Sequence, residues 1–184
     1  MGVSLANKIS IARILLVPFF VGCLLYYQPD REWLRYTAVT LFLIGALSDA
    51  VDGYIARARA QWTQLGTLLD PLADKLMLLT AFLSLAAIPR IPEDLRVPVW
   101  VVIVIVARDA FVLAGSGVVY HLTGRLEIQP ARLGKWATFT QMLVILVVLL
   151  RWPYAPALWW AAVVLTVASG IVYLRRGARL LNNA

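Results

Sequence analysis

Long runs of apolar residues are the feature of this sequence that most restricts its fold. A helix of about twenty apolar residues is long enough to cross the hydrocarbon of a bilayer. Of the 184 residues, 61% are hydrophobic, which is more than a soluble domain carries. Because lipid offers no hydrogen-bonding partners, a spanning segment must satisfy its backbone internally, which favours helices. The sequence therefore predicts an all-α integral membrane protein.

The apolar runs divide into about six predicted transmembrane helices. These cover Ser10–Tyr27, Leu34–Arg57, Leu68–Ile88, Val97–Leu122, Trp136–Leu150 and Ala157–Leu174. The connections between them are short, so we expect residues 1–184 to form a single polytopic membrane domain. The first run lacks a small-residue cleavage site and is followed by further spans, so we interpret it as a retained helix.

Positive charge is distributed unevenly over the predicted connections. Ten Lys and Arg residues fall on the side of both termini and five on the other, with Lys75 and Arg108 placed within the membrane. Short cytoplasmic loops hold the excess of Lys and Arg, so both termini are predicted on the cytoplasmic side of an inner membrane. The net charge of +7 is spread over helix ends, which favours anionic lipid headgroups as partners and argues against nucleic acid.

Four aspartates within the apolar runs form the candidate functional site. Asp49 and Asp52 are three residues apart, and Asp70 and Asp74 are four apart, so each pair shares one face of a helix. The basic segment between the pairs predicts an antiparallel hairpin over approximately residues 34–88, with the carboxylates near its cytoplasmic end. Buried carboxylates are costly in hydrocarbon, which makes these four functional candidates.

A divalent metal is the simplest counter-charge for four converging carboxylates. Protonation or a Lys or Arg partner are the other possibilities. Oxygen ligands favour Mg²⁺ or Mn²⁺, and four carboxylates can hold two ions about 4 Å apart, a geometry suited to phosphoryl transfer. Gly53, Ala56 and Gly66 beside the aspartates are small enough to admit a nucleotide, although tight helix packing would also explain them.

The same residues resemble a family signature. Asp49-x2-Asp52-Gly53-x2-Ala56-Arg57-x8-Gly66-x3-Asp70-x3-Asp74 is similar at all eight fixed positions to the motif of the CDP-alcohol phosphatidyltransferases. The resemblance implies a six-helix fold, commonly a homodimer, that transfers a phosphatidyl group from CDP-diacylglycerol to an alcohol. It implies two metal ions held by Asp49, Asp52, Asp70 and Asp74, with Asp74 also the general base. It assigns CDP binding to Asp52, Gly53, Ala56, Arg57 and Gly66.

Three further segments bear on the acceptor alcohol. Asn7-x2-Ser10-x2-Arg13, Pro71–Lys75 and Gly134–Gln141 resemble phosphatidylglycerophosphate synthases, whose acceptor is glycerol 3-phosphate. The segment from Pro98 to Asp109 also resembles cardiolipin synthases, whose acceptor is phosphatidylglycerol. Asp109 stands where many phosphatidylglycerophosphate synthases have Glu, and a second Arg-Glu pair is missing downstream. Glycerol 3-phosphate is the predicted acceptor, with phosphatidylglycerol as the alternative.

A phosphate-bearing acceptor needs cationic partners, and three basic residues are candidates. They are Arg108, Lys135 and Arg132. Arg108 and Asp109 could instead form a buried structural pair, and the other two could be ordinary cytoplasmic positive charges.

Two other functions use intramembrane carboxylates. A divalent-cation transporter would need acidic groups along a continuous path, whereas these aspartates cluster at one end of the spans. A prenyltransferase of the aromatic-substrate type would carry two Asp-rich motifs far apart in a longer chain. A structural membrane protein would leave the carboxylate cluster unexplained. The transporter and the structural alternative both predict that a CDP-linked lipid is not consumed.

Overall fold

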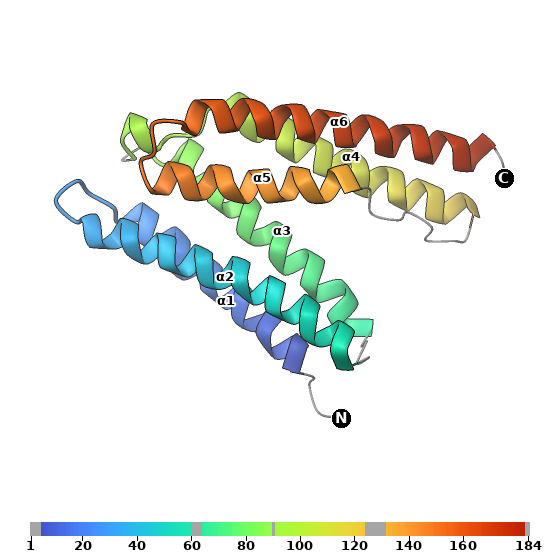
Figure 1. Ribbon diagram of the computed structural model, residues 1–184, viewed down its shortest axis with the longest axis horizontal. Coiled ribbons are helices and arrows are strands. Elements are labelled where there is room, and N and C mark those ends of the chain that lie inside the picture. Colours follow the sequence, from blue (N-terminus) through green and yellow to red (C-terminus); the bar gives the residue numbers. More distant parts are fainter. Residues whose placement is uncertain (1–4, 60–63, 90, 124–131, 183–184) are drawn as a thin grey trace. The chain divides into compact units, whose positions relative to one another are not determined.

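The computed structural model describes residues 5–59, 64–89, 91–123 and 132–182. The side chains of residues 5–9, 49–59, 64–74, 94, 116, 118–120, 122–123, 132 and 179–182 lie outside what it describes. Within these ranges the chain forms six α-helices, one 3₁₀ turn and no strand (Figure 1). The helices are α1 (Leu5–Leu25), α2 (Glu32–Arg59), α3 (Gln64–Ala87), α4 (Val99–Thr123), α5 (Arg132–Leu149) and α6 (Ala155–Asn182), and the 3₁₀ turn is η1 (Glu93–Leu95).

Each predicted span coincides with one helix, so the all-α prediction is confirmed for the described residues. The helix ends differ from the predicted span ends because the spans follow apolar composition alone. For example, α6 continues past Leu174 through Arg175 and Arg176, and α5 begins at Arg132 rather than Trp136. Arg and Lys are good helix formers, so a helix continues beyond its apolar run.

Backbone contacts group the chain into two compact units. Unit 1 contains Met1–Val97 and Val148–Arg151, and unit 2 contains Pro98–Val147 and Trp152–Ala184. In unit 1, α1 packs against both α2 and α3, which also contact each other. Successive helices of this unit run in opposite directions, so α1 begins at the end where α2 finishes and α3 starts (Figure 1).

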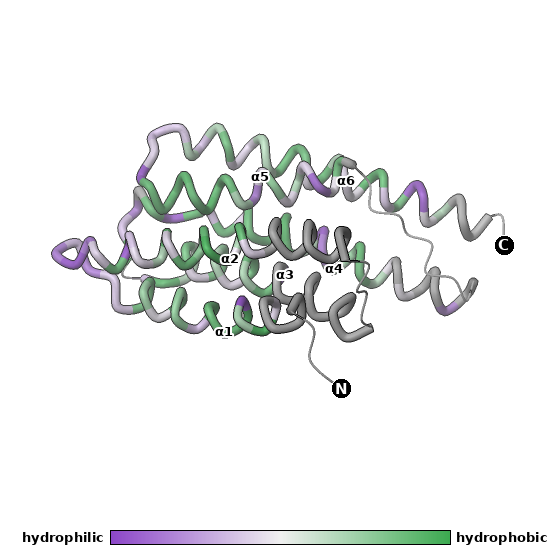
Figure 2. The backbone as a smooth tube through the Cα atoms, turned by 60° about the horizontal axis from the view of Figure 1, so that its bottom comes forward, coloured by the Kyte–Doolittle hydropathy of each residue, from purple (hydrophilic) through white to green (hydrophobic). Residues whose placement is uncertain are grey.

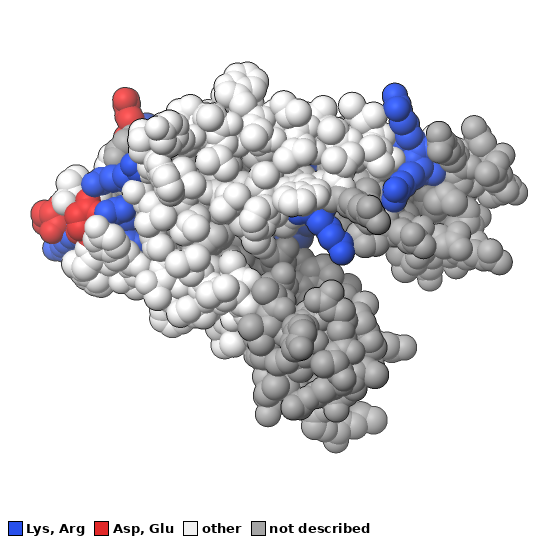
Figure 3. All heavy atoms as spheres, viewed as in Figure 1, with Lys and Arg blue, Asp and Glu red and all other residues white. Residues whose placement is uncertain are grey.

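An ion-pair cluster closes the opposite end of unit 1. Glu32 accepts hydrogen bonds from Arg35 Nε at 2.6 Å, from Arg151 Nη1 at 2.6 Å and from the Tyr27 hydroxyl at 2.9 Å. Arg35 also donates to the carbonyl of Leu149 at 2.7 Å. The Arg35 hydrogen bond is the main reason that the pKa of Glu32 lies below its usual value. Figure 3 shows acidic and basic side chains gathered at this end of the unit.

Arg151 adopts a left-handed backbone conformation, with φ of 56°. Its N–H donates to the carbonyl of Val148, and the N–H of Trp152 donates to the carbonyl of Val147, which together form a Schellman cap on α5. Glycine is usual at this position because other residues are strained there. The hydrogen bonds from the Arg151 guanidinium to Glu32 and Tyr27 offset the backbone strain that arginine has at this position.

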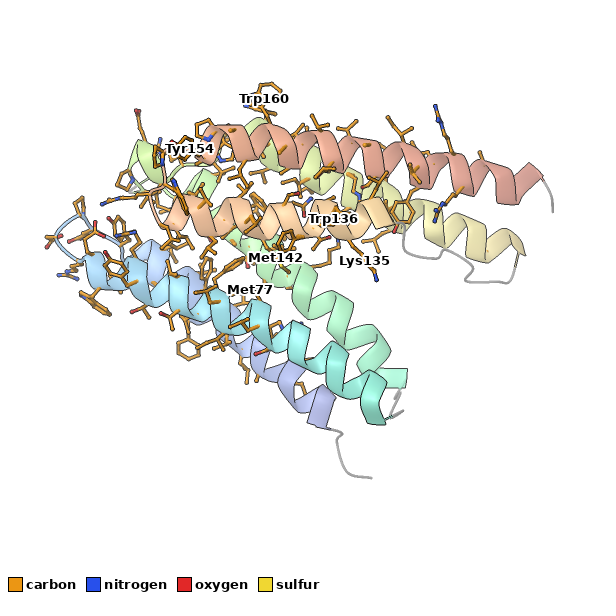
Figure 4. All side chains as sticks on the ribbon, in the orientation of Figure 1. Met77, Lys135, Trp136, Met142, Tyr154 and Trp160 are labelled. Atoms are coloured by element: carbon orange, nitrogen blue, oxygen red, sulfur yellow. The ribbon has the colours of Figure 1, made fainter. Side chains whose placement is uncertain are left out.

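In unit 2, α4 packs along α6. Trp100 and Trp160 contact each other at one end of this pair, with ring centroids 5.0 Å apart and ring planes tilted by 44°. Trp160 is labelled on α6 in Figure 4. A buried hydrogen bond of 3.0 Å joins α5 to α6, from Gln141 Nε2 to Thr166 Oγ1. Polar bonds between helices therefore supplement apolar packing in this unit.

The described part of the chain contains one helical stretch that is long and apolar enough to cross a membrane by length and composition, Ala155–Ala178. Shorter apolar stretches occur at Ser10–Leu25, Lys75–Ala87 and Leu133–Leu149. Figure 2 shows mostly hydrophobic residues along the described helices and hydrophilic residues at the α1–α2 turn. Many large apolar side chains are exposed, among them Leu15, Phe19, Leu47, Phe111, Leu113, Val164 and Leu174.

Candidate active site

The two aspartate pairs lie on the two helices of the predicted hairpin. Asp49 and Asp52 fall in the last three turns of α2, and Asp70 and Asp74 fall in the first three turns of α3. Their side chains lie outside the described residues, as do those of Gly53, Ala56, Arg57 and Gly66. Seven of the eight motif positions fall on helices within the predicted spans, whereas Gly66 lies on α3 two residues before the predicted start of that span at Leu68.

On α2, helical spacing relates the aspartate positions to the face that packs inside unit 1. Ala38, Phe42 and Gly45 form a buried stripe at spacings of four and three residues. The same alternation continues to positions 49 and 52, because residues three and four apart share one side of a helix. The positions of Asp49 and Asp52 therefore extend the inner face of α2.

On α3, a buried stripe also leads to the aspartate positions, in this case toward the start of the helix. Leu85, Ala81 and Met77 are buried and form one stripe. Followed toward the start of the helix, this stripe continues to positions 74 and 70. Since α2 and α3 are antiparallel (Figure 1), the two stripes lead to the aspartate positions at the same end of unit 1.

The chemistry of this donor set suits a hard divalent cation. Four carboxylates on two contacting helices supply only oxygen ligands, which Mg²⁺ and Mn²⁺ prefer and zinc or copper sites use less. The residue types at these four positions are therefore ones that such a cation accepts as ligands.

In unit 2, Arg108 on α4 is held on several sides. Its side chain is only 9% exposed. Nη1 pairs with Asp109 Oδ1 at 2.7 Å, and Nε donates to Ser169 Oγ of α6 at 3.0 Å. The guanidinium carbon lies 5.3 Å from the centre of the Tyr173 ring, within range of a cation–π interaction. The pair with Asp109 is thus present, and it fixes the orientation of the guanidinium.

Glycine in the first turn of α5 allows this arrangement. A Cβ atom at Gly134 would lie 3.2 Å from Arg108 Nη2 and 3.3 Å from the Tyr173 hydroxyl oxygen. Arg108 Nη2 therefore lies against the start of α5, where helix N–H groups and the helix dipole favour anions. A side chain at position 134 would therefore require Arg108 and Tyr173 to move by a few tenths of an ångström.

The other two candidate cations lie on the same turn. Lys135 follows Gly134 and projects from α5 with its side chain exposed (Figure 4). Arg132 is the first residue of α5, and its side chain lies outside the described residues.

Ser169 and Tyr173 were not identified from the sequence as partners of Arg108. The available signal was a small polar residue and an aromatic residue four apart, on one face of an otherwise apolar helix. Their separation from Arg108 in sequence hides the contact, which depends on how α4 and α6 pack.

Comparisons with known proteins agree with the motif. Residues 3–168 match the family model described as CDP-alcohol phosphatidyltransferase. The chain is 34% identical over 201 residues to CDP-diacylglycerol--glycerol-3-phosphate 3-phosphatidyltransferase of Bacillus subtilis, covering 98% of each protein. It is 31% identical over 179 residues to the protein of the same name from Escherichia coli, covering 93% of each. A third such relative, from Haemophilus influenzae, is 31% identical over 175 residues, covering 91% of this chain and 89% of that protein. The match over nearly the whole chain, together with the two aspartate pairs on adjoining helices, means that this protein belongs to the CDP-alcohol phosphatidyltransferase family.

Proposed function

We propose that the protein transfers the phosphatidyl group of CDP-diacylglycerol to glycerol 3-phosphate, releasing CMP and forming phosphatidylglycerophosphate for phospholipid biosynthesis. The observation that carries this proposal is the continuation of two buried helix faces, in contact with each other, into the aspartate pairs of the family motif. Relatives that match the chain along most of its length are named for this reaction.

The reaction exchanges one phosphoester bond for another. The acceptor hydroxyl oxygen attacks the phosphorus of the phosphatidyl group, and the bond from that phosphorus to the CMP oxygen breaks. CMP leaves with the bonding electron pair, and the hydroxyl proton passes to the Asp74 carboxylate, the general base. A low-dielectric site that excludes water would limit hydrolysis of the lipid donor.

Two divalent ions complete the proposed site. Asp49, Asp52, Asp70 and Asp74 would hold them, and the ions would draw charge from the diphosphate, making CMP a better leaving group. The CDP moiety would bind over the α2–α3 hairpin, with Asp52, Gly53, Ala56, Arg57 and Gly66 as its contacts.

The acceptor assignment rests on two supports. The first support is that the three relatives described above are named for transfer to glycerol 3-phosphate, and none of the three is named as a cardiolipin synthase. The second support is the set of contacts that hold Arg108 against the start of α5, where an anion is favoured. Arg108, Lys135 and Arg132 would be the phosphate partners. Phosphatidylglycerol as acceptor, giving cardiolipin, is the less favoured alternative.

We further propose that the six helices all cross the inner membrane, with both termini and the active site on the cytoplasmic side. Large exposed apolar side chains occur on α1, α2, α4, α5 and α6, which suits a surface in contact with lipid. Assembly as a homodimer and organisation as a single domain stay predictions.

The direct test is CMP release by the purified protein with CDP-diacylglycerol and Mg²⁺, with glycerol 3-phosphate and phosphatidylglycerol offered separately. We expect CMP and phosphatidylglycerophosphate with the first acceptor and no cardiolipin with the second. Formation of cardiolipin would support phosphatidyl transfer but reject glycerol 3-phosphate as the acceptor. A lack of CMP with either acceptor would reject the proposed reaction.

A further inference from the structure

The inner face of α1 is polar where it approaches the aspartate end of unit 1. Its buried positions farther along the helix are apolar, such as Phe20 and Leu24. Toward its start they are Ser10, which is 0% exposed, and Arg13, which is 2% exposed. Counting charges along the sequence treats Arg13 as an ordinary positive residue of the cytoplasmic side. In the structure it is instead one of the largest fully buried side chains.

Contacts around Gly45 locate Arg13 relative to the other two helices. A Cβ atom at Gly45 of α2 would lie 3.8 Å from Arg13 Cγ of α1 and 3.4 Å from Met77 Cε of α3. All three helices of unit 1 therefore meet in one layer at Arg13, Gly45 and Met77. Met77 is labelled on α3 in Figure 4.

This layer adjoins the aspartate positions. Asp49 is four residues beyond Gly45 on α2, and Asp74 is three residues before Met77 on α3. At 1.5 Å of rise per residue, both positions lie about 4.5–6 Å along the unit from the Arg13 layer, on the same side of it. Side chains on a helix lean toward its N-terminus, which for α1 is the direction of the aspartates.

A buried guanidinium requires an anionic counterpart, because a charge without one is strongly destabilising. The acidic side chains of unit 1 that the structure describes are Asp30, Glu32 and Glu93, at the far end around the α1–α2 turn and η1. Glu32 is already engaged there by Arg35 and Arg151. The aspartates of the motif are thus the acidic positions next to Arg13.

We propose that Arg13 is a positioning residue that supplies a fixed positive charge to the aspartate site. The inference rests on the proposed function, because it concerns the same site. The charge of Arg13 restrains the carboxylates before metal binds and favours the anionic diphosphate once metal is bound. It therefore acts in opposite directions on the two ligands, weakening metal binding to the empty site and strengthening nucleotide binding.

The test is to neutralise Arg13 and measure the two affinities separately. Arg13→Met keeps much of the side-chain length and removes the charge, and Arg13→Lys is the matched control that keeps it. Mn²⁺ affinity is read by electron paramagnetic resonance on protein without nucleotide, and CDP affinity by competition at saturating Mn²⁺. We expect Arg13→Met to bind Mn²⁺ roughly 5- to 10-fold more tightly and CDP roughly 5- to 10-fold more weakly, the scale of one screened charge a helical turn away.

Arg13→Lys should stay within about threefold of the unmodified protein for both ligands, since lysine preserves the charge. Unchanged affinities in Arg13→Met, or a parallel loss of both, would overturn the inference, because a purely structural arginine gives one of those results. If Arg13→Met does not fold, the double variant Arg13→Met/Asp49→Asn should restore folding by rebalancing charge, and its failure would also count against the proposal. Absence of CMP release by the unmodified protein would instead reject the reaction itself.

Discussion

Replacing Gly134 by alanine should disturb Arg108 without removing any functional group. The added Cβ would lie 3.2 Å from Arg108 Nη2 and 3.3 Å from the Tyr173 hydroxyl, so the guanidinium must shift by a few tenths of an ångström. That shift weakens its bonds to Asp109 and Ser169. Hydrogen bonds to charged groups contribute about 1.5–3 kcal/mol, and alanine regains about 1 kcal/mol of helix propensity, which leaves a net loss of about 1 kcal/mol.

The matched control is Gly115→Ala on α4. Among the described residues, no atom beyond the chain neighbours and local helix backbone of Gly115 lies within 4 Å of a Cβ at this position, so alanine there should only stabilise the helix, by about 0.5–1 kcal/mol. The two variants should therefore differ by about 2 kcal/mol in unfolding free energy, measured by denaturant titration in detergent micelles.

The functional effect of Gly134→Ala should appear in acceptor binding. If the displaced guanidinium loses about 1.4 kcal/mol of interaction with the acceptor phosphate, the KM for glycerol 3-phosphate rises about tenfold, while the KM for CDP-diacylglycerol stays near its original value. A Gly134→Ala protein as stable as Gly115→Ala, with an unchanged KM for glycerol 3-phosphate, would refute both the close packing and the phosphate role of Arg108.

Three other perturbations test separate parts of the molecule. Asp74→Asn should lower kcat about 10²- to 10⁴-fold while CDP still binds, and normal turnover would remove Asp74 as the base. Chelation of divalent ions should abolish CMP release and added Mg²⁺ should restore it; activity that survives chelation would contradict the metal site. Because the folded-state pKa of Glu32 lies below its unfolded value, its stabilising contribution is complete above the unfolded pKa and is lost as pH falls through the folded one. Glu32→Gln should therefore flatten the acid side of the stability–pH curve, and an unchanged curve would mean that this cluster does not contribute.

The sequence predicts the helices because each apolar run is long and separated from the next by polar connections. It also places the aspartate pairs correctly on two successive helices, since spacings of three and four residues are a property of the helix itself. The inner stripe of α2 and α3 then follows from helical periodicity.

Other features depend on packing that no local pattern encodes. Ser169 reaches Arg108 across 61 residues of sequence, and Arg151 reaches Glu32 across 119. The burial of Arg13 could not be predicted because its charge is typical of a helix end facing water. Its position becomes meaningful only when Gly45 and Met77 are seen to lie in the same layer.

The ion pair between Arg108 and Asp109 has a consequence for membrane insertion, if α4 crosses the bilayer as we propose. The partners are adjacent in the chain, so their bond of 2.7 Å requires no other helix. An isolated Arg or Asp at the centre of a translocating helix costs about 2.5–3.5 kcal/mol on insertion scales. A pair that forms as soon as α4 is helical reduces that cost during synthesis, before α6 has emerged from the ribosome to supply Ser169.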